Sequence, residues 1–468
     1  MSRIPLSPLD AVFVQSDSEL TPMHVAALMQ FELPEAADDA FVADLVARFR
    51  SHQQFSKPWN LVLEKPRTLQ LRPCMQTAQH IDMEYHVRHL ALPRPGGERE
   101  LGQLIARLHS QRMDLRKPLW ECHVIEGLAD RRFAIYMKLH HALIDGVSGS
   151  RMLMRALVTD PKQLGQLPFW ATGSGPDKSQ PSAAPKARKR LPRPAELIEA
   201  ARASARLWVE AGDAFNTTLR AAPMTPFNGR VGPQRRFATH AEPITRLKRI
   251  AKAADASLND IVLAMTGSAL RAYLLEMNAL PELGLTASIP VSMREADDTS
   301  TGNAVSMIFA NTGTHIADER ARVEAIKAST AMGKARLRAL SPAAQKLFPV
   351  FLLAPVAGAM ISGLAGRTPP AFNVTVSNVP GGNEQRYLYG ARLTNIYPVS
   401  IAMHGAGLNI TCYSHAGILN FGFTACRDSV PHVQRLAVYF GRAVERLEEV
   451  FCSGNAAASF EAPQHSVA

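Results

Sequence analysis

The pattern of hydrophobic and polar positions changes character along the chain and predicts both helices and strands. Strict alternation over residues 133–140 predicts a strand with Phe133, Ile135, Met137 and Leu139 on one face. Other strands are predicted at residues 61–64, 121–125, 373–377, 407–414 and 418–424, and helices at 39–49, 98–111, 150–157, 195–216 and 261–275. Because both element types occur in both halves of the chain, the pattern predicts an α/β fold.

The composition divides the chain into two similar regions. Residues 1–170 and 195–452 flank a stretch at 171–194 that is rich in Pro, Ala, Ser and basic residues. Such composition is typical of a flexible linker, and residues 453–468 are predicted to be a disordered tail. A chain of 468 residues is long for a single core, so we expect two globular domains.

One uncharged stretch, residues 347–366, lies between Lys346 and Arg367. Twenty residues are enough to cross a bilayer, but two prolines and several glycines interrupt this stretch. We therefore expect a broken helix that is buried in the protein or lies at a membrane interface.

The net charge of +11 predicts attraction to polyanions. The sequence contains no helix-turn-helix, zinc-finger or RNA-binding signature, so nucleic acid is not an expected partner. A basic cluster at residues 186–190 fits either a solvated linker or docking on anionic lipid. Five cysteines without metal-binding spacing, and no secretory signal at the start of the sequence, predict a cytoplasmic location.

A histidine pair closes the strand predicted at residues 133–140, and His140, His141, Asp145 and Gly146 follow one another over seven residues. By alternation His141 lies on the apolar face, where loss of hydration keeps an imidazole neutral and able to accept a proton. This position suits a general base that activates a hydroxyl or thiol. His140 is assigned a supporting role.

The residues after the histidines have several possible roles. Asp145 could be a triad member, a helix N-cap or the partner of a distant arginine, and we favour the arginine partner because the turn aims Asp145 away from His141. Gly146 lacks a Cβ, so it permits either a positive φ or the close approach of a substrate.

Two rival chemistries fit the same segment poorly. The sequence Gly-Val-Ser-Gly-Ser at 146–150 misses the last glycine of the G-x-S-x-G nucleophile elbow. H-E-x-x-H and Cys-x-x-Cys patterns are absent, so no metal is expected.

The pattern HHxxxDG resembles the signature of CoA-dependent acyltransferases of the chloramphenicol acetyltransferase and condensation superfamily. Further segments are similar, in order, to those of the bacterial wax ester synthase/acyl-CoA:diacylglycerol acyltransferase family. These segments are residues 7–10, 22–25, 118–120, 228–230, 235–237, 259–260, 290–294, 302–303 and 373–381.

This resemblance implies two chloramphenicol-acetyltransferase-like sandwich domains with the active site in a tunnel at their interface. It also implies transfer of an acyl group from long-chain acyl-CoA to a fatty alcohol or diacylglycerol, for neutral lipid storage. His141 would take the alcohol proton and return it to the leaving thiolate. Acyl-CoA is then a substrate and no cofactor is expected. The expected location is the cytoplasm, with peripheral association to anionic membrane or lipid inclusions.

Three further residues are candidates for the site. Asn259 precedes a strongly apolar helix and could bind the thioester oxygen or the alcohol, although Ser-x-x-Asp at 257–260 is also a capping pattern. Arg294 is expected to pair with Asp145 from its place in a family motif. Met403 could line the substrate tunnel or pack in the core.

Alternative functions remain open from the sequence. His140 and Asp145 also satisfy H-x4-D, the pattern of glycerol-phosphate acyltransferases, in which His140 would be the base. A condensation-type acyltransferase using a carrier-protein thioester shares the HHxxxDG motif. The alternative that is not an enzyme is a lipid-droplet binding protein.

Overall fold

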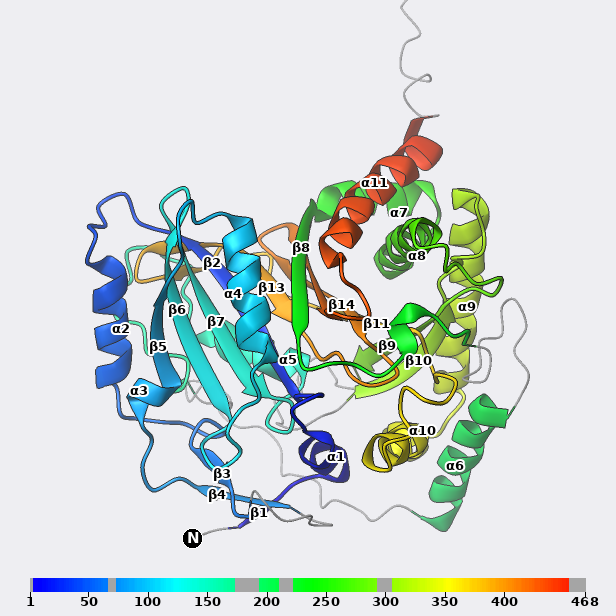
Figure 1. The fold of residues 1–468 in the computed structure, drawn as a ribbon, viewed down its shortest axis with the longest axis horizontal. Helices are drawn as coiled ribbons and strands as arrows, with labels where there is room; N and C mark the ends of the chain where they lie inside the picture. Colours follow the sequence, from blue (N-terminus) through cyan, green and yellow to red (C-terminus); the bar gives the residue numbers. More distant parts are fainter. Residues whose placement is uncertain (1–2, 66–72, 173–192, 210–221, 293–304, 454–468) are drawn as a thin grey trace, which may run out of the picture.

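Two six-stranded sheets form the centre of the protein (Figure 1). The computed structural model describes residues 3–65, 73–172, 193–209, 222–292 and 305–453. The first sheet has the order β12 (Tyr387–Leu388), β13 (Ala391–Val399), β2 (His24–Glu32), β7 (Arg132–His140), β6 (Trp120–Leu128) and β5 (Val87–Ala91). The second has the order β10 (Val305–Asn311), β9 (Thr286–Ser292), β11 (Val374–Val379), β14 (Leu408–His415), β15 (Ile418–Cys426) and β8 (Arg235–Pro243). The mixed α/β prediction is confirmed.

The first sheet is completed by strands from the second half of the chain. β13 pairs antiparallel with β2, from Val399 opposite Ala26 to Arg392 opposite Glu32, and β12 extends the sheet beyond β13. Two strands of the first sheet, β12 and β13, therefore come from the sequence after the expected boundary at residues 171–194. Residues 173–192 and 454–468, which contain most of the expected linker and tail, lie outside the described residues.

Helices cover both faces of the first sheet. α2 (Phe41–Ser51) covers one face, where the ring of Phe41 lies 5.9 Å from that of Phe133 and Leu45 and Phe49 belong to the same core. α4 (Glu98–Ser110) covers the other face with Leu101, Leu104, Ile105 and Leu108, which follow the i, i+3, i+4, i+7 spacing of an amphipathic helix. β7 is consequently buried on both sides.

The second sheet has its main helical layer on the side away from the first half. This layer consists of α7 (Ile244–Ala253), α8 (Leu258–Glu276), α9 (Glu319–Arg338) and α11 (Val433–Cys452). Between the two halves, β13 packs directly on β14 and β15, and α4 packs on β8. These contacts place the ends of β2, β7, β11 and β14 around a shared space.

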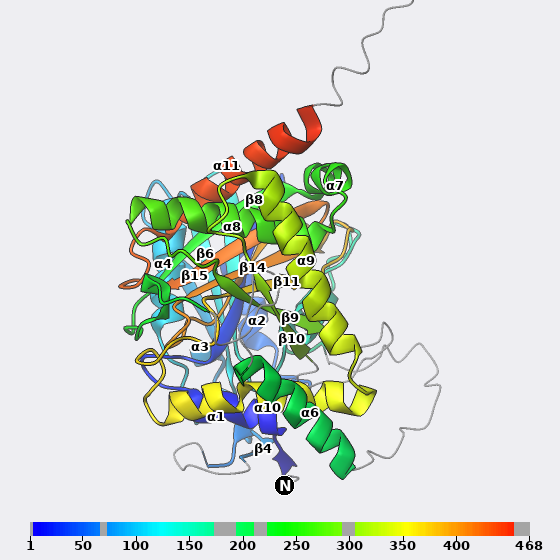
Figure 2. The same ribbon diagram turned by 90° about the vertical axis from the view of Figure 1, so that its right-hand side faces the viewer.

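Three helices close the end of the molecule where that space lies. α1 (Pro8–Ser16) and α10 (Pro342–Ile361) pack on each other, and α6 (Pro194–Val209) packs on α10. Figure 2 shows α6 crossing in front of α10, with α1 beside them. The remaining short elements are α3 (Met83–His86), α5 (Gly146–Arg155), a 3₁₀ turn (Pro226–Asn228), β1 (Ile4–Pro5), β3 (Leu61–Leu63) and β4 (Cys74–Thr77).

The helix α10 departs from the expectation for residues 347–366. It continues through Pro349 and Pro355, so the expected break does not occur within it. It is apolar and long enough to cross a membrane, yet only 22% of its most apolar window is buried. Burial within the protein is therefore wrong for most of the helix, and an interfacial position is the part of the expectation that remains.

Candidate active site at the end of β7

The turn after β7 joins the histidine pair to the start of α5. β7 ends at His140, and Asp145 is the N-cap of α5, accepting a hydrogen bond from the backbone N–H of Ser148 at 2.7 Å. The helix therefore begins at Gly146, four residues before the predicted start. Asp145 thus has the N-cap role, one of the roles open to it from the sequence, where an arginine partner was favoured.

Gly146 is needed for space and not for backbone freedom. Its φ is not positive, but a Cβ at this position would lie 3.2 Å from Cγ2 of Val379 on β11. Because Gly146 and Val379 both line the cavity described next, the glycine keeps the gap between the two halves open.

A cavity of about 320 Å³ lies between the two sheets. Its wall comes from α1, β2, the turn after β7, α5, β9, β10, α10, β11, β13 and β14. His141, Leu139 and Met403 line it, and most of the other lining residues are apolar. Among the lining residues that the structure describes, Asp145 is acidic and none is a lysine or arginine. The cavity therefore favours an apolar ligand.

His141 is held at this cavity from several sides. Its ring stacks on Phe13 of α1, with centroids 4.1 Å apart and an interplanar angle of 18°, and its backbone N–H donates to the carbonyl of Met23 at 2.9 Å. Desolvation lowers the pKa of His141, against the opposing effects of a hydrogen bond to its own backbone and the charges of Asp145 and Asp10. The imidazole is thus neutral near pH 7, as expected from the sequence.

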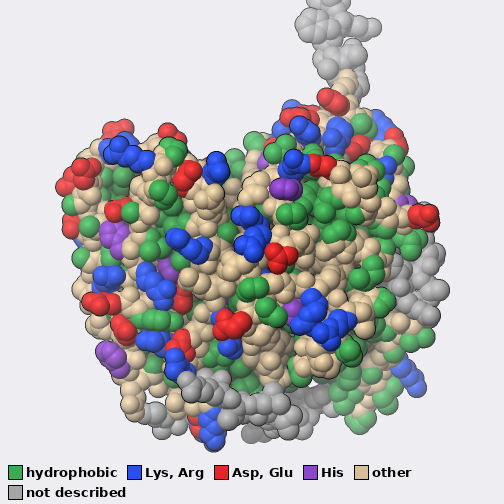
Figure 3. Space-filling view, in the orientation of Figure 1, with side chains coloured by type: hydrophobic (Ala, Val, Ile, Leu, Met, Phe, Trp, Pro, Cys, Tyr) green, Lys and Arg blue, Asp and Glu red, His purple; other side chains and the backbone are tan. Residues whose placement is uncertain are grey.

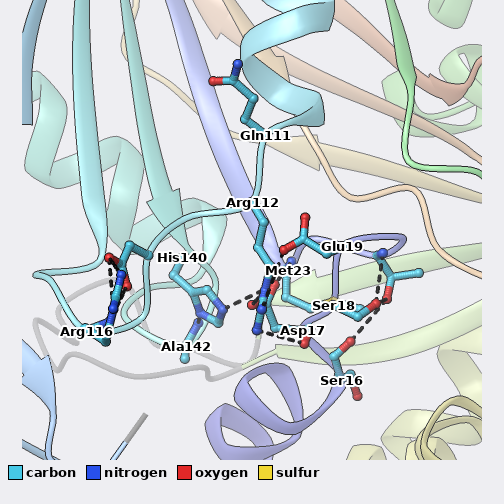
Figure 4. Close-up of polar contacts among 12 residues, drawn as sticks. Ser16, Asp17, Ser18, Glu19, Met23, Gln111, Arg112, Arg116, His140 and Ala142 are labelled. Carbon is cyan, nitrogen blue, oxygen red and sulfur yellow. Dashed lines mark hydrogen bonds and ion pairs between the residues drawn. The ribbon is translucent and has the colours of Figure 1, made fainter. Parts of the chain in front are cut away.

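His140 has a different environment, in which Asp17 and Arg112 are its neighbours (Figure 4). Its Nδ1 accepts a hydrogen bond from the backbone N–H of Ala142 at 3.1 Å, and its Nε2 lies 4.0 Å from Oδ1 of Asp17. Burial, aided by the charges of His141 and Arg112, lowers the pKa of His140 to about 3. His140 is not among the residues that line the cavity.

Asp17 and Arg112 brace this side of the site and were missed from the sequence. Nε of Arg112 donates to Oδ2 of Asp17 at 2.6 Å, and the backbone N–H of Met23 donates to Oδ1 of the same carboxylate at 2.8 Å. Desolvation raises the pKa of Asp17, and the charge of Arg112 opposes that rise. Since Met23 also accepts from His141, the carboxylate helps to fix the segment that positions the imidazole.

The motif at residues 7–10 has a local explanation. The Ser7 side chain caps α1 by accepting from the backbone N–H of Asp10 at 3.2 Å, and its hydroxyl donates back to the Asp10 carboxylate at 2.7 Å. The capped helix presents Leu9 and Phe13 to the cavity. The cap itself was readable from the sequence, whereas the stacking on His141 depends on the tertiary fold.

Other segments of the family pattern support the site without entering it. The carbonyl of Leu119 accepts from the backbone N–H of His140 at 3.0 Å, and the buried Asn228 donates to the carbonyls of Phe372, Asn373 and Gly405. The guanidinium of Arg235 donates to the carbonyls of Leu20 and Ala402, so it joins segments from both halves.

The remaining sequence candidates have different positions. Met403 lines the cavity, but Asn259 does not. Asn259 lies in the first turn of α8, where Ser257 and Asp260 form the capping box, so the structural interpretation of this pattern is confirmed and a substrate role for Asn259 stays a prediction. Arg294 lies outside the described residues, as do residues 302–303, and its pairing with Asp145 also stays a prediction.

Polar groups on the second sheet were not singled out from the sequence. Ser377 of β11 and Asn409, Thr411 and Tyr413 of β14 line the cavity that His141 lines from the first half. The Ser150 hydroxyl donates to the Tyr413 hydroxyl at 2.8 Å, and the Thr411 hydroxyl donates to Oδ1 of Asn409 at 2.7 Å. No cluster of three or more metal-ligating side chains occurs within the described ranges. The arrangement offers a neutral base with hydrogen-bonding groups in an otherwise apolar space.

Comparison with known proteins identifies both halves of the chain. The wax ester synthase/diacylglycerol acyltransferase catalytic domain matches residues 6–262, and the C-terminal domain of the same family matches residues 301–448. A putative diacylglycerol O-acyltransferase of Mycobacterium tuberculosis is 40% identical over 94% of this chain and 96% of its own length. One from Mycobacterium bovis is also 40% identical, over 95% and 98%.

Solved structures agree with these matches. The wax ester synthase/diacylglycerol acyltransferase from Marinobacter aquaeolei VT8 superposes with a TM-score of 0.76 at 34% identity, over 95% of this chain and 98% of that one. The first condensation domain of the calcium-dependent antibiotic synthetase, with a TM-score of 0.59 at 16% identity over 95% and 97%, shares the fold alone. The two-domain fold implied by the sequence is thereby confirmed, and the chain belongs to the wax ester synthase/diacylglycerol acyltransferase family.

Proposed function

We propose that this acyltransferase moves a long acyl chain from CoA to the hydroxyl of a fatty alcohol or diacylglycerol, with His141 as the base. The observation that carries the proposal is the position of His141: a neutral imidazole on the wall of a largely apolar cavity between the two sheets. Acyl-CoA is the donor in this scheme, which uses no cofactor.

The reaction is direct transfer. His141 accepts the alcohol proton as the oxygen attacks the thioester carbonyl, and the resulting tetrahedral oxyanion collapses and expels the CoA thiolate. The imidazolium then protonates that thiolate, so the same residue acts first as the base and then as the acid. General acid–base help of this kind contributes on the order of 10² to 10⁴ in rate.

The oxyanion needs hydrogen-bond donors within the cavity. The hydroxyl and amide groups of Ser377, Asn409, Thr411 and Tyr413 are candidates because they line the same cavity as His141. Donors of this kind stabilise a developing oxyanion most when water is excluded. Asp145 supports the reaction indirectly, by capping α5 and by favouring the imidazolium through its charge.

The substrates imply contact with a lipid surface, and we infer that the enzyme is cytoplasmic and binds such surfaces peripherally. α10 supports this inference because its inner face supplies Pro349 and Leu353 to the cavity while its outer face exposes Val350 and Ile361. Figure 3 shows hydrophobic side chains gathered at the lower right, where α6 and α10 lie. Exposed apolar patches of this kind commonly mark contact sites for membranes or other proteins.

The test is thiol release by purified protein given palmitoyl-CoA and either hexadecanol or dioleoylglycerol, with the ester identified by chromatography. We expect CoA release that depends on the acceptor, loss of that release in His141→Ala, and retention of measurable turnover in His140→Ala. No acceptor-dependent release by the folded wild type would overturn the proposal. Loss of activity in His140→Ala alone would instead identify His140 as the base.

A further inference from the structure

The described residues that line the catalytic cavity include no cation to bind the phosphates of an acyl-CoA. CoA carries a pyrophosphate and a 3′-phosphate, whereas the described lining of the cavity holds no lysine or arginine and includes the carboxylate of Asp145. Arginine is the side chain best suited to phosphate because its planar fork donates two parallel hydrogen bonds. The phosphorylated end of the donor therefore needs a cationic site next to this cavity.

A second cavity, of about 710 Å³, adjoins the first and is called here the α6–α9 groove. It lies between α6, α9, the edge strand β10 and Phe348 of α10, a region that faces the viewer in Figure 2. Met307 of β10 lines both cavities. The groove and the catalytic cavity thus meet at Met307, which has a flexible side chain.

The walls of the α6–α9 groove combine basic and apolar groups. Arg202 and Arg206 are one turn apart on α6, and Arg336 belongs to α9. The acidic residue of the groove, Glu199, accepts hydrogen bonds from the backbone N–H and the hydroxyl of Ser341, and these bonds lower its pKa. Among the lining residues that the structure describes, three arginines stand against this one hydrogen-bonded carboxylate, so the described wall is predominantly basic.

A third cavity, which is also rich in arginine, fits phosphate less well. Its arginines form ion pairs: Arg88 with Glu121, Arg112 with Asp17, and Arg116 with Asp114. It also shares no described lining residue with the catalytic cavity. By contrast, neither Arg202 nor Arg206 forms an ion pair with a carboxylate in the described part of the chain.

We propose that the α6–α9 groove binds the phosphorylated end of acyl-CoA through Arg202, Arg206 and Arg336, while the thioester end passes Met307 into the catalytic cavity. This proposal rests on the proposed acyl-CoA-dependent function and names the donor subsite. Phosphate groups also occur on lipid headgroups, so the experiment must separate these two sources.

The test compares palmitoyl-CoA with palmitoyl-pantetheine, which carries the same thioester without phosphates. In Arg202→Gln/Arg206→Gln we expect KM for palmitoyl-CoA to rise roughly tenfold or more, because the charge-assisted hydrogen bonds to the phosphates are lost. KM for palmitoyl-pantetheine and for hexadecanol should not change. The matched control is Arg99→Gln/Arg107→Gln, which removes two exposed arginines of α4 and should leave all three KM values unchanged.

Two further measurements make each outcome decisive. Calorimetric binding of adenosine 3′,5′-bisphosphate should weaken in the α6 variant and not in the control, and this readout holds even if the wild type proves inactive. Equal changes in KM for both thioesters, or none, would overturn the proposal. Loss of binding to phosphatidylglycerol vesicles with unchanged discrimination between the thioesters would assign the arginines to lipid headgroups instead.

Discussion

At the scale of single residues, two adjacent histidines have opposite surroundings because they end a strand. Alternation sends His141 to the cavity side shared with Leu139 and sends His140 toward Asp17. This difference was predictable from the sequence because it depends only on the period of a β-strand. The stack of His141 on Phe13 was not predictable, since it joins a helix and a strand that are far apart in the chain.

The depressed pKa of His141 predicts the acid limb of the pH profile. A general base acts when it is deprotonated. We therefore expect kcat/KM to be at its plateau above the pKa of His141 and to fall as the pH drops through that pKa. Desolvation places this loss below pH 6.5, the ordinary value for imidazole. Asp10→Asn removes a charge that raises this pKa, so the acid limb should move to lower pH. The measurement is kcat/KM from pH 4.5 to 8, with Asp44→Asn as the control variant. An acid limb that moved to higher pH in Asp10→Asn, or did not move, would contradict this assignment.

Gly146 should be sensitive to one added methyl group. In Gly146→Ala the Cβ meets Val379, so we expect kcat/KM to fall on the order of tenfold through a misplaced acceptor, with little change in Tm. Gly165→Ala is the control because a Cβ there would meet nothing within 4 Å. The second-site change Val379→Ala should restore activity, and a failure of that rescue in a folded double variant would argue against a steric cause.

At the scale of elements, regular patterns were predictable and tertiary exceptions were not. The strand at residues 133–140 and the helix at 98–111 agree with β7 and α4 within one residue, because alternation and i, i+4 spacing define them locally. α10 was misjudged because its prolines lower helix propensity while its packing on α1 and α6 maintains the helix. The start of α5 was misplaced because Gly146 and Gly149 weaken a helical pattern.

The outer face of α10 should bind lipid. Val350 is 39% and Ile361 55% exposed, so Val350→Glu/Ile361→Glu places two charges on the helix without entering the core. We expect binding to phosphatidylcholine/phosphatidylglycerol vesicles to weaken by more than roughly tenfold, since each buried aliphatic side chain contributes about 1.5–3 kcal/mol.

The control for α10 carries the same chemistry elsewhere. Leu275→Glu/Val438→Glu changes two exposed apolar residues of α8 and α11, which pack on each other on the opposite side of the molecule from α10 in Figure 1. Vesicle flotation should show no loss for this control. Equal loss in both variants, or none in the α10 variant, would refute docking through α10.

At the scale of the whole molecule, the two halves of the chain share the first sheet. β13 supplies Leu393 and Ile396 to the core on one face of the first sheet, and Tyr397 and Val399 to the core on the other. Sequence patterns could not show this exchange, because a strand pattern does not identify its partner. The family resemblance supplied the two-domain fold, and the pairing of β2 with β13 came only from the structure.

The exchange predicts that residues 1–170 do not fold alone. Without β13, β2 loses a full edge of hydrogen bonds and both cores lose apolar side chains. We expect the isolated fragment to lack a cooperative unfolding transition by circular dichroism, whereas the full chain shows one. Cooperative unfolding of the fragment, with a midpoint near that of the full chain, would show that the crossover is dispensable.

The position of β13 late in the sequence also affects folding during synthesis. A ribosome releases β2 and β7 early, but the strand that closes their sheet emerges only after residue 399 has been made. Until then the backbone N–H and C=O groups along one edge of β2 lack their partner strand, and β13 does not yet line the cavity beside His141. We therefore expect chaperones to bind the nascent chain during most of its synthesis. Activity should appear only when synthesis is nearly complete.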